Sequence, residues 1–269
     1  TNEASDGQLH KKAKLIDLIN IDFGPIHPLT GPVYVEEAEV GDILAVDLID
    51  IELHDYGWQA IVGGFGFLTD RFPEPKLNVH TIDTINKTTM FNGKVKIPLK
   101  PFPGVMGVAP DTEEMLSTIP PRANGGNMDD PSIVEGTTVY FPVFVKGALF
   151  SIGDAHAVQG LGEVCGTAIE APMTFVYRLR VLKNKPAIQE PQYETDDFYA
   201  VTGFGETIDI ATKKAVNFMV DHLSENYDIS AEDAYMLCSL VGDLKIAEVV
   251  DVPNMLVTMH FPKSILDQL

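Results

Sequence analysis

The sequence predicts a mainly β fold, a sandwich or distorted barrel of short strands, with a C-terminal α+β portion. Short apolar runs separated by Pro and Gly turns fill most of the chain. A charged stretch at residues 183–197 carries two prolines and is typical of a linker. Beyond it, apolar residues recur at helical spacing. We therefore expect a β-rich body at residues 1–190 and a small α+β portion at residues 191–269.

The β-rich body is expected to contain strands at residues 33–35, 43–53, 88–90, 94–97, 104–108, 139–145, 148–152 and 176–182. The glycine-rich stretch at residues 57–66 lacks the Gly-Lys-Ser/Thr ending of a phosphate-binding loop, so we expect a loop that packs close to other backbone. The segments at 139–145 and 148–152 predict a hairpin around the Lys146-Gly147 turn. Pro142 predicts that this hairpin lies at an edge or contains a bulge.

The C-terminal portion is expected to combine helices with strands. A first helix is expected at about residues 209–223, because apolar residues there share one stripe: Ala211, Ala215, Phe218, Met219 and, at its end, His222. Ser230 is the expected N-cap of a second helix, which runs to Leu240 and stops at Gly242. Strands are then expected at residues 244–250 and 255–261.

The composition argues against several classes of protein. The chain has 269 residues, long enough for a substantial core, and a formal net charge of -20. Nucleic acids and anionic membranes both need basic patches, so neither is an expected partner. No run approaches the ~20 apolar residues of a membrane-spanning helix. The two cysteines, Cys165 and Cys238, make no disulfide framework, and we therefore expect a cytoplasmic protein.

The chemistry-bearing residues gather in the stretch from Gly153 to Glu170. Asp154 and His156 are two residues apart, so on an extended strand they project from one face. Glu163 and Glu170 follow within reach, among glycines that let the backbone turn tightly. Carboxylates and an imidazole are suitable ligands for zinc and are equally suited to general acid–base catalysis. A strand with a surface Asp-x-His and a polar turn would give the same pattern.

The polar segment at residues 118–130 leaves two interpretations open. It is turn-rich and ends in Asp129 and Asp130 before a proline. Most loops of this composition are solvated connectors, but loops on rigid scaffolds often carry function. The second interpretation is a loop that brings Asp129 to a metal.

The motifs along the chain resemble, in order, those of the acetamidase/formamidase family of amide hydrolases. The matching segments are Gly31–Glu36, Gly63–Phe67, Asn124–Asp129, Gly153–Glu170 and Ser239–Leu244. One position departs from the family pattern, because Leu161 stands between two glycines where the family usually has an Asp.

The resemblance implies that a metal-activated water hydrolyses a short aliphatic amide, formamide or acetamide, to a carboxylate and ammonia. Asp129, Asp154 and His156 match the family motifs and would hold zinc, while Glu163 would act as the base. Backbone N–H groups near residues 160–162 would help to stabilise the oxyanion. Calcium would suit surplus oxygen donors such as Asn127 and Glu36. The resemblance also implies a homo-oligomer.

Two alternatives stay open. A catalytically impaired metal-binding β-sandwich of the same family would fit the substitution at Leu161. A Cys165-dependent amidase would use the thiol inside the central motif as its nucleophile, although acidic and apolar surroundings disfavour a thiolate.

Overall fold

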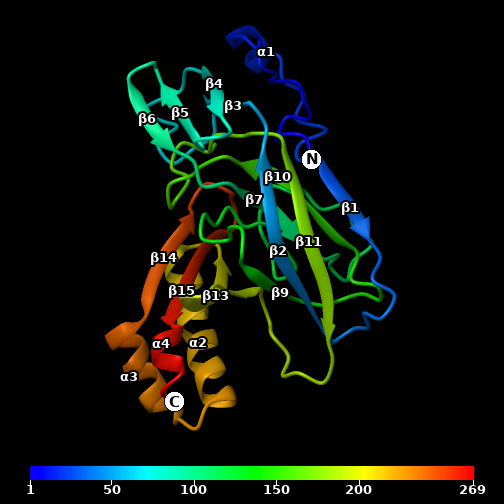
Figure 1. The fold of residues 1–269 in the computed structure, drawn as a ribbon, viewed down its shortest axis with the longest axis vertical. Helices are drawn as coiled ribbons and strands as arrows, with labels where there is room; N and C mark the ends of the chain where they lie inside the picture. The colour runs from blue at the N-terminus through cyan, green and yellow to red at the C-terminus, as the bar shows by residue number, and fades with distance from the viewer.

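The computed structural model, which describes residues 1–269, is built around three antiparallel sheets (Figure 1). The mainly β prediction with a C-terminal α+β region is thereby confirmed. The strands are β1 (Leu29–Val33), β2 (Ile43–Leu53), β3 (Tyr56–Ile61), β4 (Lys76–Asp83), β5 (Thr88–Phe91), β6 (Val95–Pro98), β7 (Phe102–Gly107), β8 (Gly125–Asn127), β9 (Thr138–Pro142), β10 (Phe150–His156), β11 (Met173–Leu182), β12 (Gln192–Glu194), β13 (Phe198–Gly205), β14 (Asp243–Glu248) and β15 (Met255–Pro262). The helices are α1 (Leu15–Ile19), α2 (Ile208–Asn226), α3 (Ala231–Val241) and α4 (Lys263–Leu266).

The largest sheet has seven strands in the order β11-β2-β9-β12-β13-β15-β14. The other two have four strands each, in the orders β1-β10-β7-β8 and β3-β4-β5-β6. The main core fills the space between the seven-stranded sheet and the β1-β10-β7-β8 sheet. Leu44 and Phe141 lie on the first side, and Met106, Phe150 and Ile152 lie on the second. This sandwich buries nearly all of β10, whose last residues reach the candidate site.

The segment expected to be a linker contains a strand of the seven-stranded sheet. Gln192–Glu194 forms β12, which pairs with β9 on one side and β13 on the other. Pro186 and Pro191 both precede this short strand and do not end the sheet. The sheet therefore runs across residue 190, and the boundary between residues 1–190 and 191–269 stays a prediction.

The expected hairpin of residues 139–145 and 148–152 is wrong. The first segment forms β9, which pairs with β2 and β12, whereas the second forms β10, which pairs with β1 and β7. Ala148 and Leu149 both have positive φ, and this turn sends the chain to the facing sheet. Pro142 ends a central strand opposite Ile43 and does not mark an edge.

The glycine-rich stretch at residues 57–66 is only partly a loop. Its first half belongs to β3, and Trp58 lies buried there opposite Val79 of β4, a strand that the sequence did not indicate. The buried side of β3 receives the N-terminal segment, because Leu9 and Leu18 pack with Trp58 in one apolar cluster.

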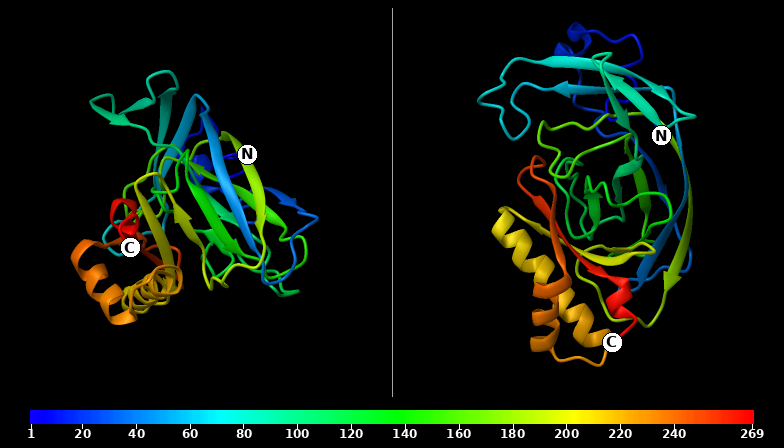
Figure 2. Two further views of the ribbon diagram at one scale, coloured as in Figure 1. Left: turned by 60° about the horizontal axis from the view of Figure 1, so that its bottom comes forward. Right: turned by 60° about the vertical axis from the view of Figure 1, so that its left-hand side comes forward.

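The two long C-terminal helices confirm the predicted spacing, and α3 confirms the predicted cap at Ser230. Thr207 and Ser230 cap α2 and α3 by accepting backbone N–H groups, and Gly242 follows α3. Both helices lie on one face of the β13-β15-β14 end of the large sheet (Figure 2). Gly203 permits this close packing, since a Cβ there would lie 2.3 Å from the carbonyl oxygen of Ala211. None of the helices combines the length and apolar character needed to cross a bilayer.

Candidate functional site

A small cavity of about 80 Å³ lies at the C-terminal end of β10. Its polar side carries Asn127 and the Asp, Glu and His side chains of four separate segments, and no Lys or Arg lines it. Its apolar side includes Phe23, Ile26, Phe65 and Ile119. The cavity is therefore a chamber for a small molecule, with an acidic wall and an apolar wall.

β10 delivers Asp154 and His156 to this chamber from one face of the strand. Their side chains meet, with Oδ2 of Asp154 lying 3.6 Å from Nε2 of His156, and both are buried. This arrangement is what the spacing of the two residues predicts. His27, from the segment before β1, approaches the same Asp154 oxygen through its Nε2 at 3.7 Å.

Asp129 reaches the chamber from the loop after β8. The N–H groups of Met128 and Asp129 both donate to the carbonyl oxygen of Gly104, which holds the loop against β7. Oδ1 of Asp129 then lies 3.6 Å from Nδ1 of His156. Of the two interpretations of residues 118–130, the structure favours the loop that brings Asp129 to the site.

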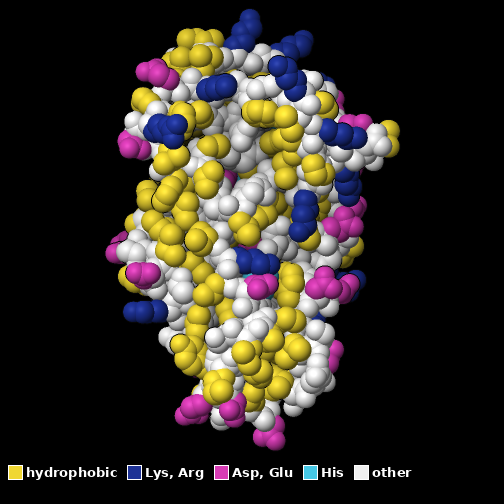
Figure 3. All heavy atoms as spheres, turned by 90° about the vertical axis from the view of Figure 1, so that its left-hand side faces the viewer, with side chains coloured by type: hydrophobic (Ala, Val, Ile, Leu, Met, Phe, Trp, Pro, Cys, Tyr) yellow, Lys and Arg dark blue, Asp and Glu magenta, His cyan; other side chains and the backbone are white.

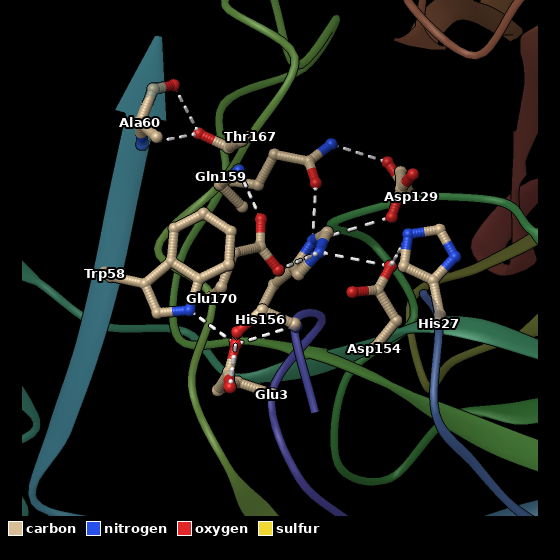
Figure 4. A network of polar contacts seen from close by, with 12 residues as sticks. Glu3, His27, Trp58, Ala60, Asp129, Asp154, His156, Gln159, Thr167 and Glu170 are labelled. Carbon is tan, nitrogen blue, oxygen red and sulfur yellow. Dashed lines mark hydrogen bonds and ion pairs between the residues drawn. The ribbon is translucent and has the colours of Figure 1, made fainter. Parts of the chain in front are cut away.

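Glu163 and Glu170 come from the loop between β10 and β11. Gly162 anchors the first part of this loop, since its N–H donates to Ala247 at 2.7 Å and its carbonyl accepts from Val249 at 3.2 Å. Glu170 exchanges two backbone hydrogen bonds with Trp58 of β3. Its Oε2 lies 3.0 Å from Nε2 of His156 (Figure 4).

Three carboxylates of the site sit on strained backbone. Asp129, Asp154 and Glu163 have φ of 43°, 47° and 43°, a region that residues other than Gly rarely adopt. Such strain persists only where the surrounding structure enforces it, and it clusters at functional sites. The backbone thus supports a functional role for these residues independently of their side-chain chemistry.

The chamber concentrates buried negative charge. Six carboxyl groups are buried in it or beside it: Asp129, Asp154, Glu163, Glu170, Glu248 and Asp251. Burial raises the pKa of Glu170 to about 7 and the pKa of Glu248 to about 8. Burial and the neighbouring Asp129 raise the pKa of Glu163 well above its ordinary value.

The two histidines offset part of this charge. Burial alone would raise the pKa of Asp154, but the charges of His27 and His156 outweigh it and lower that pKa to about 2. Burial opposes the charged form of His156, yet the carboxylates of Glu170, Asp154 and Asp129 hold its pKa well above its ordinary value. His156 alone does not supply enough positive charge for all six carboxyl groups to ionise, in line with the raised pKa values of Glu163, Glu170 and Glu248.

The residues present fit a divalent cation. Six buried side-chain oxygens around the chamber have no hydrogen-bond partner: one each on Asn127, Asp129, Asp154, Glu170, Glu248 and Asp251. Two triads bring their donor atoms within 4.8 Å of one another, Asp129/His156/Glu163 and Asp154/His156/Glu170. Carboxylate oxygens with imidazole nitrogen are ligands that zinc uses in proteins. The absence of a side chain at Gly104 leaves room for the carboxylates of the site, since a Cβ there would lie 2.4 Å from Oδ1 of Asp129.

Three features singled out in the sequence lie away from the chamber. Glu36 is exposed and does not line the cavity, so it adds no oxygen donor there. Leu161 is half exposed, on the outside of the Glu163 loop. The N–H of Gly162 is already bonded to Ala247 and is unavailable to an oxyanion.

Cys165 also lies outside the chamber, in a neighbouring surface depression. Its thiol lies 3.3 Å from the carbonyl oxygen of Thr167 and 3.8 Å from that of Ala60. Carbonyl oxygens accept the thiol proton and do not stabilise a thiolate. These contacts therefore give no support to Cys165 as a nucleophile.

Sequence reasoning missed four polar residues of the site. His27, Gln159, Glu248 and Asp251 all lie at or beside the chamber. His27 precedes a proline, which signals only a turn, and Glu248 lies within the strand expected at residues 244–250. Gln159 lies three residues after His156, and this closeness in sequence was the one available signal.

Comparisons with known proteins identify similar sequences and structures. Residues 1–118 and 112–268 match the model of the Acetamidase/Formamidase family. The chain is 26% identical to the formamidase of Methylophilus methylotrophus, over 97% of this chain and 82% of that protein. It is 30% identical to the acetamidase of Mycolicibacterium smegmatis, over 62% of this chain and 56% of that protein.

Two solved structures are also similar. The acetamidase of Bacillus halodurans has a TM-score of 0.94 and 31% identity, covering 100% of this chain and 89% of that one. A predicted acetamidase/formamidase of Thermoanaerobacter tengcongensis has a TM-score of 0.93 and 34% identity, covering 100% and 87%.

Proposed function

Because the chain belongs to the acetamidase/formamidase family, we propose that it hydrolyses a short aliphatic amide, formamide or acetamide, to the carboxylate and ammonia. The observation that carries this proposal is the chamber at the end of β10, where buried carboxylates surround His156 without enough positive charge to neutralise them. Its apolar wall and its volume of about 80 Å³ suit a substrate of few atoms.

We propose that His156 and the carboxylates beside it hold one divalent cation, with zinc as the expected metal. Asp154 and Asp129, the ligands expected from the sequence, both lie 3.6 Å from a ring nitrogen of His156, and Glu170 lies closer still. A metal bound here would supply Lewis acidity toward the amide carbonyl and would lower the pKa of a water molecule. The remaining oxygen donors, Asn127 included, would also suit calcium.

Glu163 is the proposed base. Its carboxyl is buried beside Asp129, and the raised pKa makes its carboxylate a stronger base toward a water proton than an exposed glutamate would be. It would accept a proton from the attacking water and donate it to the amide nitrogen as the C–N bond breaks, so that ammonia leaves. Water adds one oxygen to the carbonyl carbon, and no other reactant is needed.

The N-terminal segment lines the chamber and shields part of it from bulk water. Glu3 is buried, accepts the indole N–H of Trp58 and also accepts the backbone N–H of Ser5. Phe23 and Ile26 of the same segment belong to the apolar wall. A partly shielded, partly apolar chamber strengthens the electrostatic interactions inside it.

We further propose that the protein works in the cytoplasm as a homo-oligomer. Two unpaired cysteines support a reducing compartment. Exposed apolar side chains of α3 and of the sheet edge at β14, Met236, Leu240, Leu244 and Ile246, support a contact with a second copy. Figure 3 shows hydrophobic side chains gathered on this side of the molecule.

An ammonia-release assay with formamide, acetamide and benzamide tests the proposed activity. We expect faster turnover of the two small amides than of benzamide, because the chamber is small. His156→Ala should remove the activity, whereas Gly160→Ala should not, since nothing lies within 4 Å of a Cβ at Gly160. Equal turnover by the wild type and His156→Ala would contradict the proposal.

A further inference from the structure

Gln159 connects the chamber to the Asp129 loop and to β14, and the proposed mechanism gives it no role. Its Oε1 lies 2.8 Å from Nδ1 of His156 (Figure 4). Its Nε2 lies 2.6 Å from the carbonyl oxygen of Asp129 and 3.5 Å from that of Ala247. The side chain thus spans from the imidazole to the backbone of the Asp129 loop and of β14.

The neighbours of Gln159 determine which way its amide faces. Backbone carbonyl oxygens only accept hydrogen bonds, so the amide end beside Asp129 and Ala247 must be the NH₂ group. The reversed amide would place two oxygens 2.6 Å apart with no hydrogen between them. The carbonyl oxygen of Gln159 therefore faces His156. Because that oxygen also only accepts, Nδ1 of His156 must carry a proton.

The proton on Nδ1 decides which side of the ring can bind a cation. A metal requires a neutral imidazole, and with Nδ1 protonated the lone pair lies on Nε2. Nε2 faces Glu170 at 3.0 Å and Asp154 at 3.6 Å, whereas Asp129 contacts Nδ1. The backbone N–H of Ala168 holds the other oxygen of Glu170 at 2.8 Å, which keeps Oε2 directed at the ring.

We propose that Gln159 is a positioning residue that keeps His156 in its Nδ1–H form, so that Nε2, Asp154 and Glu170 together receive the cation. The role of Gln159 rests on the proposed function in one respect, that a cation binds in the chamber. Of the two triads that share His156, it selects the one that contains Glu170. Asp129 then lies beside Nδ1, the nitrogen that keeps its proton.

The direct test uses NMR of the full-length protein with isotope-labelled histidine, loaded with an NMR-active cadmium isotope. His156→Ala assigns the signals of this residue among the seven histidines. We expect coupling between cadmium and Nε2 of His156, with the proton retained on Nδ1. Coupling to Nδ1, or no coupling to His156 at all, would overturn the proposal, and this readout needs no Gln159 variant to fold.

Variants of Gln159 test the positioning role. Gln159→Leu removes the acceptor, and we expect zinc affinity to fall by about 10- to 100-fold, as for other residues that orient a metal-bound histidine. Gln159→Glu restores an acceptor oxygen at Nδ1, so the cadmium coupling to Nε2 and part of the affinity should return. Gln59→Leu is the matched control, because Gln59 contacts Cys165 outside the chamber. Wild-type zinc affinity in Gln159→Leu would refute the role.

The experiments separate this proposal from the proposed function. Coupling to Nε2 in a protein that releases no ammonia from any amide would support the role of Gln159 and refute the activity. Ammonia release by a protein whose cadmium couples to Nδ1 would support the amide hydrolysis and refute the role of Gln159.

Discussion

The carboxylates of Asp129 and Asp154 meet next to Gly104 of β7. An alanine Cβ there would lie 2.4 Å from Oδ1 of Asp129 and 2.9 Å from Oδ2 of Asp154. Gly104→Ala should therefore displace both groups, and we expect kcat/KM to fall by about 100-fold, the cost of a misplacement near 1 Å. Zinc content and ammonia release measure the effect, with Gly160→Ala as the control. A Gly104→Ala enzyme with wild-type zinc content and activity would argue against a site between these carboxylates.

Variants of Glu163 and Asp154 distinguish the catalytic base from the ligands of the cation. Glu163→Gln keeps the shape of the side chain but cannot accept the proton of water, so kcat should fall by about 10²- to 10⁴-fold while zinc content stays. Asp154→Ala removes a cation ligand instead, and zinc content and turnover should fall together. Steady-state kinetics with metal analysis of both variants decides the roles. Loss of zinc from Glu163→Gln would place Glu163 among the ligands.

At the residue scale, the sequence predicts only the local part of the site. Asp154 and His156 share a strand face, so their spacing of two was enough to bring them together. Glu248 and Asp251 meet Asp129 only because the end of β14 packs on the loop that carries Glu163. Such contacts depend on tertiary structure, and no local pattern encodes them.

His222 gives a pH prediction at the scale of one element, α2. Its ring stacks on Tyr199 with 3.9 Å between ring centroids, and its Nε2 is buried without a partner. Burial lowers the pKa of His222 to about 4, against an ordinary value of about 6.5. Between these values the unfolded chain binds more protons than the folded protein. The contribution of neutral, buried His222 to the unfolding free energy is thus complete above about pH 6.5 and is lost as the pH falls toward 4.

His222→Phe should keep the stacked ring and remove this titration. Between pH 7 and pH 4.5 we expect the wild type to lose about 2 kcal/mol more unfolding free energy than the variant. Urea unfolding of both proteins at the two pH values measures the difference, and the carboxylates of the site cancel because both proteins contain them. Parallel pH profiles would show that His222 does not titrate as its burial predicts.

At the element scale, periodicity predicted helices better than strand partners. The stripe and N-cap signals placed α2 and α3 within a few residues of their ends, because a helix is stabilised by contacts near in sequence. Strand pairing is non-local, so β9 and β10 looked like a hairpin although a turn sends them to different sheets. The three residues of β12 are too few to show a period, and only their partners β9 and β13 reveal a strand.

At the scale of the whole molecule, the sandwich holds together segments that are far apart in the chain. His27, Asp129, Asp154, Glu170 and Asp251 all line one cavity. Their buried carboxylates repel one another without a cation, so a metal that binds only the folded form should stabilise the fold by mass action. The site and the stability of the sandwich are therefore coupled.

The central claim is that a cation held around His156 supports amide hydrolysis. The most direct test measures zinc content and ammonia release from formamide and acetamide on one preparation, before chelation, after chelation and after zinc is added back. We expect activity and zinc to be lost together and to return together. Full activity in protein shown to be free of metal would contradict the account, and would leave Glu163 and its neighbours to act without a cation.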